Sequence, residues 1–408
     1  MGLPHMHRLA CLLVLACLPA AVIAADPVAQ VRVAFDREAI LASRSAGLAD
    51  VAAGRPVTAD DPVRVASISK LAVAIGVMRL VEAGTLDLDA DVSTQLHWEL
   101  RNPDYPEVPI TLRRLLSHTS SLTDAAGYWQ VPLDGELREL LADPRAWDGQ
   151  HPPGTFFRYA NLNFPIIASV MERATGERFD QLMRRLVFEP LALDACYGWS
   201  TCSDAAIAGA VVLYESPDSE PSNDHLRGQR PACPVQRARD GSCDLSTWKP
   251  GINGGLFSPQ GGMRISANGL ARIGRLLLRG GEVDGVRLLR PESVDTLFEP
   301  QWTRADGNGI THEEDEDYRP GSDYFCRYGL ATQTLATPQP GCGDDPFGDG
   351  VPRVGHSGSA YGLISGLWLD RATGTGVAYY ATGVANAAPG DDSAFTRVAE
   401  KLARDQAP

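Results

Sequence analysis

Basic residues are in the minority in this sequence of 408 residues. It has 37 lysines and arginines against 51 aspartates and glutamates, which gives a formal net charge of −14 at pH 7. An acidic surface disfavours nucleic acid and anionic membranes as partners, because both carry the same sign of charge. The chain also shows no internal repeat. We therefore expect neither nucleic acid nor an anionic membrane as a partner, and the sequence leaves the oligomeric state open.

Long apolar runs are missing after the first 24 residues. That first stretch carries Arg8, then an apolar run that ends in small residues. This is the pattern of a secretory signal peptide, and it is too short for a membrane span. We expect cleavage after Ala24, which predicts a secreted or periplasmic protein whose mature chain has no membrane span. The alternative is a lipoprotein anchored through Cys17, in which that cysteine is kept rather than removed.

Metal-binding cysteine patterns are missing as well. No C-x-x-C occurs, and no histidine lies close in sequence to the cysteines outside the signal peptide. A zinc site is therefore the weaker alternative, and we expect no metal and no cofactor. An even number of cysteines in an exported chain favours disulfides, but six cysteines allow 15 pairings. Our expectation is that sequence neighbours pair: Cys196 with Cys202, Cys233 with Cys243, and Cys326 with Cys342.

Strand patterns stand at both ends of the mature chain, and helical patterns fill its middle. QVRVAFD near residue 30 alternates like a strand, while LISGLWLD and VAYYATG form a hairpin pattern near the C-terminus. This order predicts an α/β (α+β) fold, with an α/β part made from both ends and a mostly helical region inserted between them. The α/β part is expected at about 25–66 and 262–408, and the helical, loop-rich part at about 67–261.

Two helices are expected in the second half of the chain. A capped helix runs from Ser266 to about Arg279. A final helix runs from Ser393 to about Asp405. Two irregular stretches, 196–243 and 302–352, are expected to form surface loops around a pocket.

The stretch VRVASISKLAVAIGVMRLVEAG places Ser67 at the start of an apolar helix and Lys70 one turn further along. Positions i and i+3 share a helix face, so the lysine amine can reach the serine hydroxyl. The first helical turn also offers unpaired N–H groups to a developing negative charge. This arrangement suits acyl transfer, with an ordinary N-cap serine as the alternative. The spacing alone is a weak signal, because Ser246 and Lys249 repeat it in a loop-like context.

Tyr159 and Asn161 form the only Y-x-N of the chain. A tyrosine beside a lysine can relay a proton, and an asparagine amide can both donate to and accept from a substrate. The alternative is a buried tyrosine next to a turn-forming asparagine.

A third motif, His356, Ser357 and Gly358, leads a predicted strand. The glycine would let a substrate approach the backbone, and the amide of Ser359 could join that of Ser67 in an oxyanion hole. The alternative is a strand that merely starts with a solvated histidine. The run GHSGS also approaches the G-x-S-x-G nucleophile motif, but no histidine follows position 356, and that class of hydrolase needs one there.

In this order, S-I-S-K at 67–70, Y-A-N at 159–161 and H-S-G at 356–358 resemble the three motifs of the serine β-lactamase and penicillin-binding DD-peptidase family. LRRLLSHTSSL and GGMRISANGLARIGRLLLRGG are similar to segments of its class C branch. The resemblance implies a β-lactamase/transpeptidase-like fold, with an antiparallel sheet from both termini flanked by helices. It also implies a role for each site residue: Ser67 as acylated nucleophile, Lys70 and Tyr159 as proton-transfer groups, and Asn161, His356, Ser357, Gly358 and Ser359 in substrate or oxyanion binding.

The third motif departs from that of β-lactamases, which usually have lysine where His356 stands. A histidine with an ordinary pKa of roughly 6.5 is charged in only about a quarter of molecules at pH 7. We therefore expect weaker or pH-dependent recognition of a substrate carboxylate, and slow acylation by penicillin rather than its efficient hydrolysis.

Together these observations favour an exported serine hydrolase that acts through a Ser67 acyl-enzyme. Its expected partner is a small-molecule or short-peptide substrate. This would be a small amide or ester, such as a D-amino-acid peptide cleaved in the manner of a DD-carboxypeptidase, or a carboxylic ester. A β-lactamase proper is one alternative. A non-catalytic, penicillin-binding-like receptor or scaffold is another, and the presence of Ser67, Lys70 and Tyr159 together argues against it.

Overall fold

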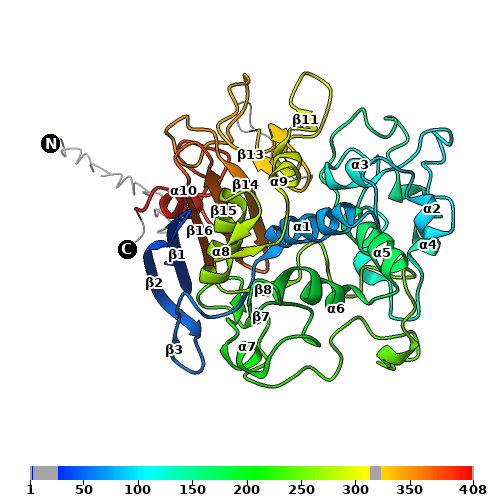
Figure 1. Ribbon diagram of the computed structural model, residues 1–408. Coiled ribbons are helices and arrows are strands. Elements are labelled where there is room, and N and C mark those ends of the chain that lie inside the picture. The colour runs from blue at the N-terminus through cyan, green and yellow to red at the C-terminus, as the bar shows by residue number, and fades with distance from the viewer. Residues whose placement is uncertain (1, 3–25, 313–322, 407–408) are drawn as a thin grey trace.

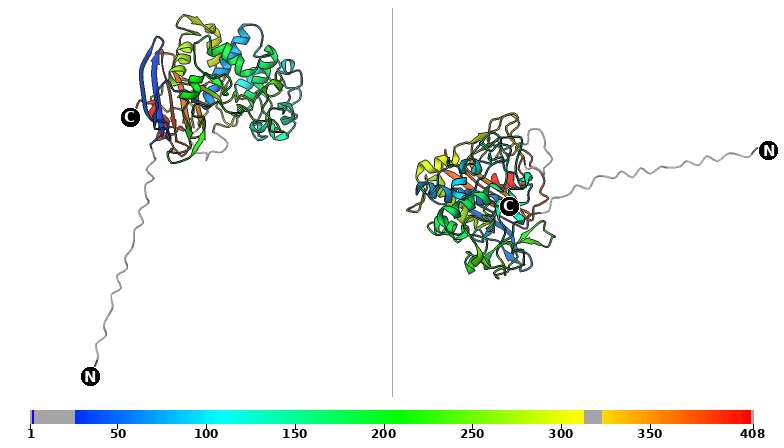
Figure 2. Two further views of the ribbon diagram at one scale, coloured as in Figure 1. Left: turned by 90° about the horizontal axis from the view of Figure 1, so that it is seen from below. Right: turned by 90° about the vertical axis from the view of Figure 1, so that its right-hand side faces the viewer.

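The computed structural model describes residues 2, 26–312 and 323–406. Apart from Gly2, the predicted signal peptide and its cleavage site lie outside the described residues. A large sheet occupies one side of the molecule and a mainly helical region the other (Figures 1 and 2). Helix α1 (Ser69–Glu82) runs between the two parts, so the segment that begins at the candidate nucleophile is central to the fold (Figure 1).

The large sheet joins the two ends of the chain, as the sequence predicts. Within the described residues it has nine strands, in the order β11-β12-β13-β14-β15-β16-β1-β2-β3. Neighbouring strands are antiparallel, and β1 meets β16 with Val31 opposite Tyr380. Their bounds are β1 Ala29–Asp36, β2 Ile40–Asp50, β3 Arg55–Pro56, β11 Trp302–Thr303, β12 Arg327–Tyr328, β13 Gln333–Thr334, β14 Val354–Ala360, β15 Leu363–Asp370 and β16 Thr375–Thr382.

Helices cover both faces of this sheet. Successive side chains of a strand point to opposite faces, so Tyr380 and Tyr379 of β16 enter different cores. Tyr380 belongs to the main core, which includes the apolar side of α8 (Ala267–Leu278). Tyr379 packs in a smaller core with α10 (Arg397–Ala403). Strand β16, which pairs with β1 and so joins the two chain ends, is thus packed against helices on both faces of the sheet (Figure 1).

One of the two predicted helix starts is confirmed and the other is wrong. Ser266 caps α8, since its hydroxyl accepts a hydrogen bond from the Gly269 N–H at 3.0 Å. The final helix begins after Thr396, not at Ser393, because the Thr396 hydroxyl accepts from the Ala399 N–H. The Ser393 hydroxyl instead donates to Glu400 at 2.7 Å, so the preceding segment folds back along the helix.

The helical region packs around α1, which is buried from Ser69 to Leu80 with few interruptions. A helix that is apolar on nearly every side is stable only inside a core, and this position agrees with its sequence. The other helices are α2 Ser93–Leu96, α3 Leu112–Leu116, α4 Leu137–Leu140, α5 Asn163–Thr175, α6 Phe179–Met183, α7 Asp204–Gly209 and α9 Pro291–Phe298.

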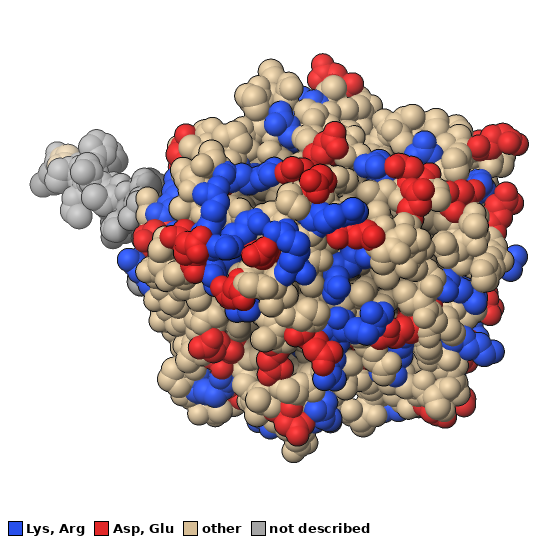
Figure 3. Space-filling model, in the orientation of Figure 1, with Lys and Arg blue, Asp and Glu red and all other residues tan. Residues whose placement is uncertain are grey.

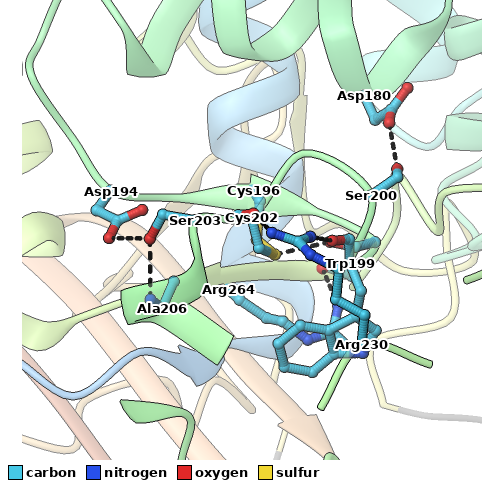
Figure 4. Close-up of a disulfide and its surroundings, with 12 residues drawn as sticks. Asp180, Asp194, Cys196, Trp199, Ser200, Cys202, Ser203, Ala206, Arg230 and Arg264 are labelled. Carbon is cyan, nitrogen blue, oxygen red and sulfur yellow. Dashed lines mark hydrogen bonds between the residues drawn. A yellow bond between two sulfur atoms is a disulfide. The ribbon is translucent and has the colours of Figure 1, made fainter. Parts of the chain in front are cut away.

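A small sheet supports the chain just before the candidate nucleophile. β4 (Val63–Arg64) pairs with β8 (Met263–Ile265), and β8 pairs with β5 (Cys196–Tyr197), next to the disulfide Cys196–Cys202 (Figure 4). Arg264 of β8 is buried, forms an ion pair with Asp224 at 2.6 Å, and lies over the Trp199 ring at 3.9 Å. The disulfide next to β5 and the buried ion pair of Arg264 therefore stabilise this small sheet.

The structure contains the three disulfides that the short-loop pairing predicts, Cys196–Cys202, Cys233–Cys243 and Cys326–Cys342. The first two lie in the irregular stretch before β8, whose regular elements are short: β5, α7, β6 (Leu213–Tyr214) and β7 (Pro221–Asn223). A further short hairpin, β9 (Glu282–Val283) with β10 (Val286–Arg287), follows α8. In the part of the chain that the structure describes, no helix combines the length and apolar character needed to cross a bilayer.

Acidic and basic side chains are interspersed on the face that carries α8 (Figure 3). Arg272 and Arg275 of α8 pair with Asp284, and Arg279 pairs with Glu38. These three arginines are therefore ion-pair partners within the protein.

Candidate active site

Ser67 lies in a short 3₁₀ turn, Ala66–Ile68, that leads directly into α1. Ala66 has a φ of +49°, a left-handed conformation that is costly for a residue with a side chain and is often found at functional sites. Ser69 fixes the turn, because its hydroxyl donates to the Ala66 carbonyl at 2.6 Å and accepts from the Met263 N–H at 3.0 Å. The fold thus holds Ser67 at a helix start, where the sequence places it.

Lys70 is fully buried, and its Nζ points back at Ser67. Nζ donates to Ser67 Oγ at 2.9 Å, to Asn161 Oδ1 at 2.8 Å and to the Gln260 carbonyl at 2.8 Å. These three acceptors fix the amine within hydrogen-bond distance of the hydroxyl. The structure therefore brings the first motif and Asn161 of the second together.

Tyr159 lies beside this amine, with its ring centroid 4.9 Å from Lys70 Nζ. Its ring stacks between His118 at 4.3 Å and Phe325 at 4.8 Å. The Ala160 N–H donates to His118 Nδ1 at 3.1 Å, so His118 holds both the ring and the backbone of this motif. Burial, and next the charge of Lys70, keep the pKa of His118 well below its ordinary value, so this histidine is neutral.

Asn161 is held from both sides. Its Oδ1 accepts from Lys70, while its Nδ2 and backbone N–H donate to Asp124 at 3.0 and 2.8 Å. Asp124 also accepts from the Leu162 N–H at 2.8 Å. Burial raises the pKa of Asp124, and these N–H groups oppose that effect by favouring its ionised form. The amide orientation of Asn161 is thus fixed by a carboxylate that the motif itself does not contain.

Gly358 of β14 passes very close to the nucleophile. A Cβ at this position would lie 3.1 Å from the Ser67 N, 2.5 Å from the Val65 carbonyl oxygen and 2.4 Å from Ser365 Oγ. Only glycine lets the strand approach this turn, and Ser359 follows it on the wall of the same cavity as Ser67. Glycine at position 358 therefore allows β14 to pack closely against the backbone of Ser67.

Ser357 and His356 do not line this cavity. The Ser357 hydroxyl accepts from the Tyr324 hydroxyl at 2.6 Å and donates to Gln333 Oε1 at 3.3 Å, beside a separate cavity of about 80 Å³. His356 is 1% exposed, with Nε2 at 2.7 Å from the Tyr328 hydroxyl and Nδ1 at 2.5 Å from the Ser357 carbonyl. Burial, with a smaller effect from Lys70, lowers the pKa of His356 to about 3.

The expectation that His356 titrates near neutral pH is therefore wrong, as is the alternative of a solvated histidine. The sequence gives its strand position but not the two tyrosines that enclose it. Its neutral form donates from Nδ1 to the Ser357 carbonyl and accepts the Tyr328 hydroxyl at Nε2. In this environment it supplies no positive charge for a substrate carboxylate above about pH 4.

The buried His356 gives a stability prediction. Between about pH 3 and the unfolded value near 6.5, the unfolded chain binds a proton that the folded chain does not, so this group makes stability rise with pH. We expect the free energy of unfolding in urea to fall as the pH is lowered from 7 to 5, and to fall less in His356→Gln, by roughly 1 kcal/mol per pH unit. Equal slopes in the two proteins would contradict a neutral, buried His356.

A cavity of about 310 Å³ brings the candidate residues Ser67, Tyr159, Asn161 and Ser359 onto one surface. Several residues that the motifs do not contain complete its wall: Arg64, Ala66, Asp124, Tyr128, Arg158, Gln260, Gly261, Ile310, His312, Ala360 and Tyr361.

Comparison with known proteins shows the family to which the chain belongs. The profile of the Beta-lactamase family matches residues 28–401, which is most of the chain. The protein belongs to the Beta-lactamase family. Among curated proteins it is similar to the esterase EstB of Burkholderia gladioli, with 35% identity over 179 residues, which are 38% of this chain and 43% of that one.

A second curated protein and a solved structure are also similar to this chain. A D-aminopeptidase of Cereibacter sphaeroides is 30% identical over 191 residues, 44% of this chain and 34% of that protein. The chain thus spans less than half the length of these curated relatives. The crystal structure of a D-amino acid amidase from Ochrobactrum anthropi has 20% identity and a TM-score of 0.62, over 93% of this chain and 95% of that one. The chain therefore has a β-lactamase-like fold.

The sequence did not predict the residues that hold Tyr159, Asn161 and Lys70 in position. His118 lies within LRRLLSHTSSL, a segment that carries part of the family resemblance, but nothing there shows that it stacks on Tyr159. Asp124 contacts the site through its carboxylate, and Gln260 through its backbone carbonyl. Both residues lie in loops, where no regular residue spacing could have predicted these contacts. The second S-x-x-K is a chance match, since Ser246 is exposed in a 3₁₀ turn, Leu245–Thr247, outside the cavity.

Proposed function

We propose that this protein is a serine hydrolase that forms an acyl-enzyme on Ser67. The observation that carries the proposal is the buried Lys70 amine at 2.9 Å from Ser67 Oγ, with Asn161 and Gln260 holding it there. A serine hydroxyl is a weak nucleophile until a base within hydrogen-bond distance takes its proton. Membership of the Beta-lactamase family supports the same conclusion.

In acylation, Ser67 Oγ attacks the substrate carbonyl carbon, and the hydroxyl proton passes to Lys70 in its neutral amine form or to Tyr159 in its phenolate form. The backbone N–H groups of Ser67 and Ser359 donate to the oxyanion that develops. The bond to the leaving group then breaks, and the same proton-transfer groups return a proton to the departing nitrogen or oxygen. Attack by water on the Ser67 ester releases the product acid and restores the free hydroxyl.

We infer that the substrates are small esters or amides, with D-amino-acid amides and peptides among them. The cavity of about 310 Å³ at Ser67 is at the small end of ligand-sized pockets. An esterase and a D-aminopeptidase among the relatives support both bond types. His356 gives no positive charge where β-lactamases usually have lysine, which argues against efficient β-lactam hydrolysis.

Turnover assays test this proposal. We expect the purified protein to hydrolyse p-nitrophenyl butyrate and D-alanine p-nitroanilide, and to hydrolyse a chromogenic cephalosporin at least about 100-fold more slowly. Faster turnover of the cephalosporin would make the protein a β-lactamase proper. No turnover of any of the three would favour a non-catalytic penicillin-binding-like receptor.

We also propose that the protein is exported and that residues 1–24 are removed. The three disulfides support this, because such bonds form and persist mainly in oxidising compartments. The proposed unit of catalysis is the remaining chain, with its α/β part at about 25–66 and 262–408. N-terminal sequencing of the secreted or periplasmic protein tests the cleavage after Ala24.

A substitution at Gly358 tests whether the close packing of β14 against Ser67 is needed for activity, because it changes no group that takes part in the chemistry. In Gly358→Ala the new Cβ would overlap the Val65 carbonyl and Ser365 Oγ, so β14 has to move away from Ser67. A shift of about 1 Å at a catalytic group costs about 100-fold in rate, and we expect a loss of that size in kcat/KM for the ester. Gly209→Ala is the matched control, because its Cβ would meet only ordinary contacts at 3.5 Å. Equal activity of both variants would contradict a role for the close approach.

A further inference from the structure

Among the described residues, the wall of the cavity at Ser67 carries more basic than acidic side chains, in a protein that is acidic overall. This wall holds Arg64, Arg158 and His312 against a single carboxylate, that of Asp124, among the described residues. Asp124 already accepts three N–H groups from Asn161 and Leu162. The whole chain has a formal charge of −14, so this concentration of basic groups is local. A local positive electrostatic potential favours the binding of an anionic ligand.

Arg64 is the arginine of this wall that lacks a carboxylate partner in the described part of the chain. Arg158 lies 3.3 Å from Asp148, whereas no Asp or Glu oxygen among the described residues lies within 4.0 Å of the Arg64 guanidinium. Its Nε donates to the Gly261 carbonyl at 3.0 Å, and its face lies over the Tyr361 ring at 4.7 Å. These contacts orient the guanidinium plane and leave its two terminal nitrogens for a ligand, which a carboxylate can bind in bidentate fashion.

The backbone that carries Arg64 is rigid. Arg64 lies on β4, opposite the buried Arg264 of β8, and β8 in turn pairs with Cys196 of the first disulfide (Figure 4). A charged group that is fixed before the ligand arrives loses little conformational entropy on binding. The fold therefore prepares this cation for recognition.

Arg64 also stands where the cavity at Ser67 meets a second one. That neighbouring cavity has a volume of about 560 Å³ and shares Arg64, Tyr128, Gln260 and Tyr361 with the first. A substrate with its carbonyl at Ser67 can therefore extend past Arg64 into the second cavity.

We propose that Arg64 binds a carboxylate of the substrate, in the part of the site that extends away from Ser67. The proposal rests on the proposed serine hydrolase function and names a feature of its substrate. It gives carboxylate recognition to a residue three positions before the nucleophile, whereas His356 is enclosed by Tyr328 and the Ser357 carbonyl and does not reach the cavity. Arg64 is a specificity residue in this account, and the acyl-transfer chemistry does not require its charge.

A matched pair of esters tests this proposal: 3-acetoxybenzoate, which carries a carboxylate, and its neutral methyl ester. We expect the wild-type protein to prefer the acid. Arg64→Gln should lower kcat/KM for the acid about 10- to 100-fold, mainly through KM, and change that for the methyl ester less than about threefold. Arg64→Lys should keep part of the preference. Arg44→Gln is the control, because it removes the same charge from the exposed strand β2.

Equal losses on both esters in Arg64→Gln would overturn the proposal, since they would mean that Arg64 only holds Gly261 and the adjoining Gln260. A wild-type protein without preference for the acid would overturn it too. Calorimetric binding of the product 3-hydroxybenzoate needs no turnover. A Kd at least about tenfold weaker in Arg64→Gln supports the proposal even if the wild type hydrolyses neither ester, a result that would contradict the hydrolase function alone. Equal Kd values would overturn the role of Arg64.

Discussion

Ser67→Ala is expected to lower kcat/KM for p-nitrophenyl butyrate by at least about 10⁴-fold. The substitution removes the oxygen on which the acyl group is proposed to be carried, and no general base can replace it. The fold should remain, because Lys70 keeps Asn161 Oδ1 and the Gln260 carbonyl as acceptors. Steady-state rates, together with circular dichroism and a thermal unfolding curve, measure both effects.

Ser246→Ala is the control for this variant. Ser246 repeats the S-x-x-K spacing but is exposed in a loop, so its removal should leave the rate within about twofold of the wild type. Retained activity in Ser67→Ala would rule out the acyl-enzyme proposed here, whatever Ser246→Ala shows.

Lys70→Arg is expected to lower the same rate by about 10³-fold while the protein stays folded. Arginine keeps hydrogen-bond donors at this position, but its guanidinium is always protonated in proteins and cannot accept the serine proton, whereas the neutral amine form of lysine can. If the lysine acts only by positioning Asn161 and Gln260, then arginine should preserve most of the activity. The variant therefore separates proton transfer from positioning.

Lys70→Met complements this test, since it removes the donors as well. Two buried acceptors, Asn161 Oδ1 and the Gln260 carbonyl, would then lose a partner, at a cost of about 1–3 kcal/mol each. We expect a lower Tm than in Lys70→Arg and a similar loss of rate. A Tm equal to that of the wild type would contradict the structural part of this account.

Local patterns in the sequence were sufficient where a feature depends on near neighbours. The i, i+3 spacing of Ser67 and Lys70 gave their contact, because a helix start fixes the geometry between them. Ser266 gave the start of α8 through an N-cap bond within one turn. Sequence neighbours gave the three disulfides, since short loops are the easiest to close. The alternation at both chain ends likewise gave the sheet that joins them.

Features that depend on distant contacts could not be predicted in this way. The state of His356 is set by Tyr328, 28 positions earlier, and by burial that no strand pattern reveals. Asp124 fixes Asn161 across 37 positions. Even over seven positions a tertiary contact was missed, because the Ser393 hydroxyl donates to Glu400 and the N-cap of the final helix is Thr396, three residues later. In each case a tertiary partner decides between local alternatives of similar plausibility.

The acyl-enzyme is tested most directly by intact mass and peptide mapping of the purified protein after incubation with a fluorophosphonate or a penicillin. We predict one fluorophosphonate adduct per chain, on a peptide containing Val65 to Lys70, and its loss in Ser67→Ala. A penicillin adduct on the same peptide would show that the site accepts a carboxylate, whereas fluorophosphonate alone would indicate an esterase for neutral substrates. No adduct with either reagent, or an adduct on the peptide of Ser246, would contradict the central claim that Ser67 is the nucleophile.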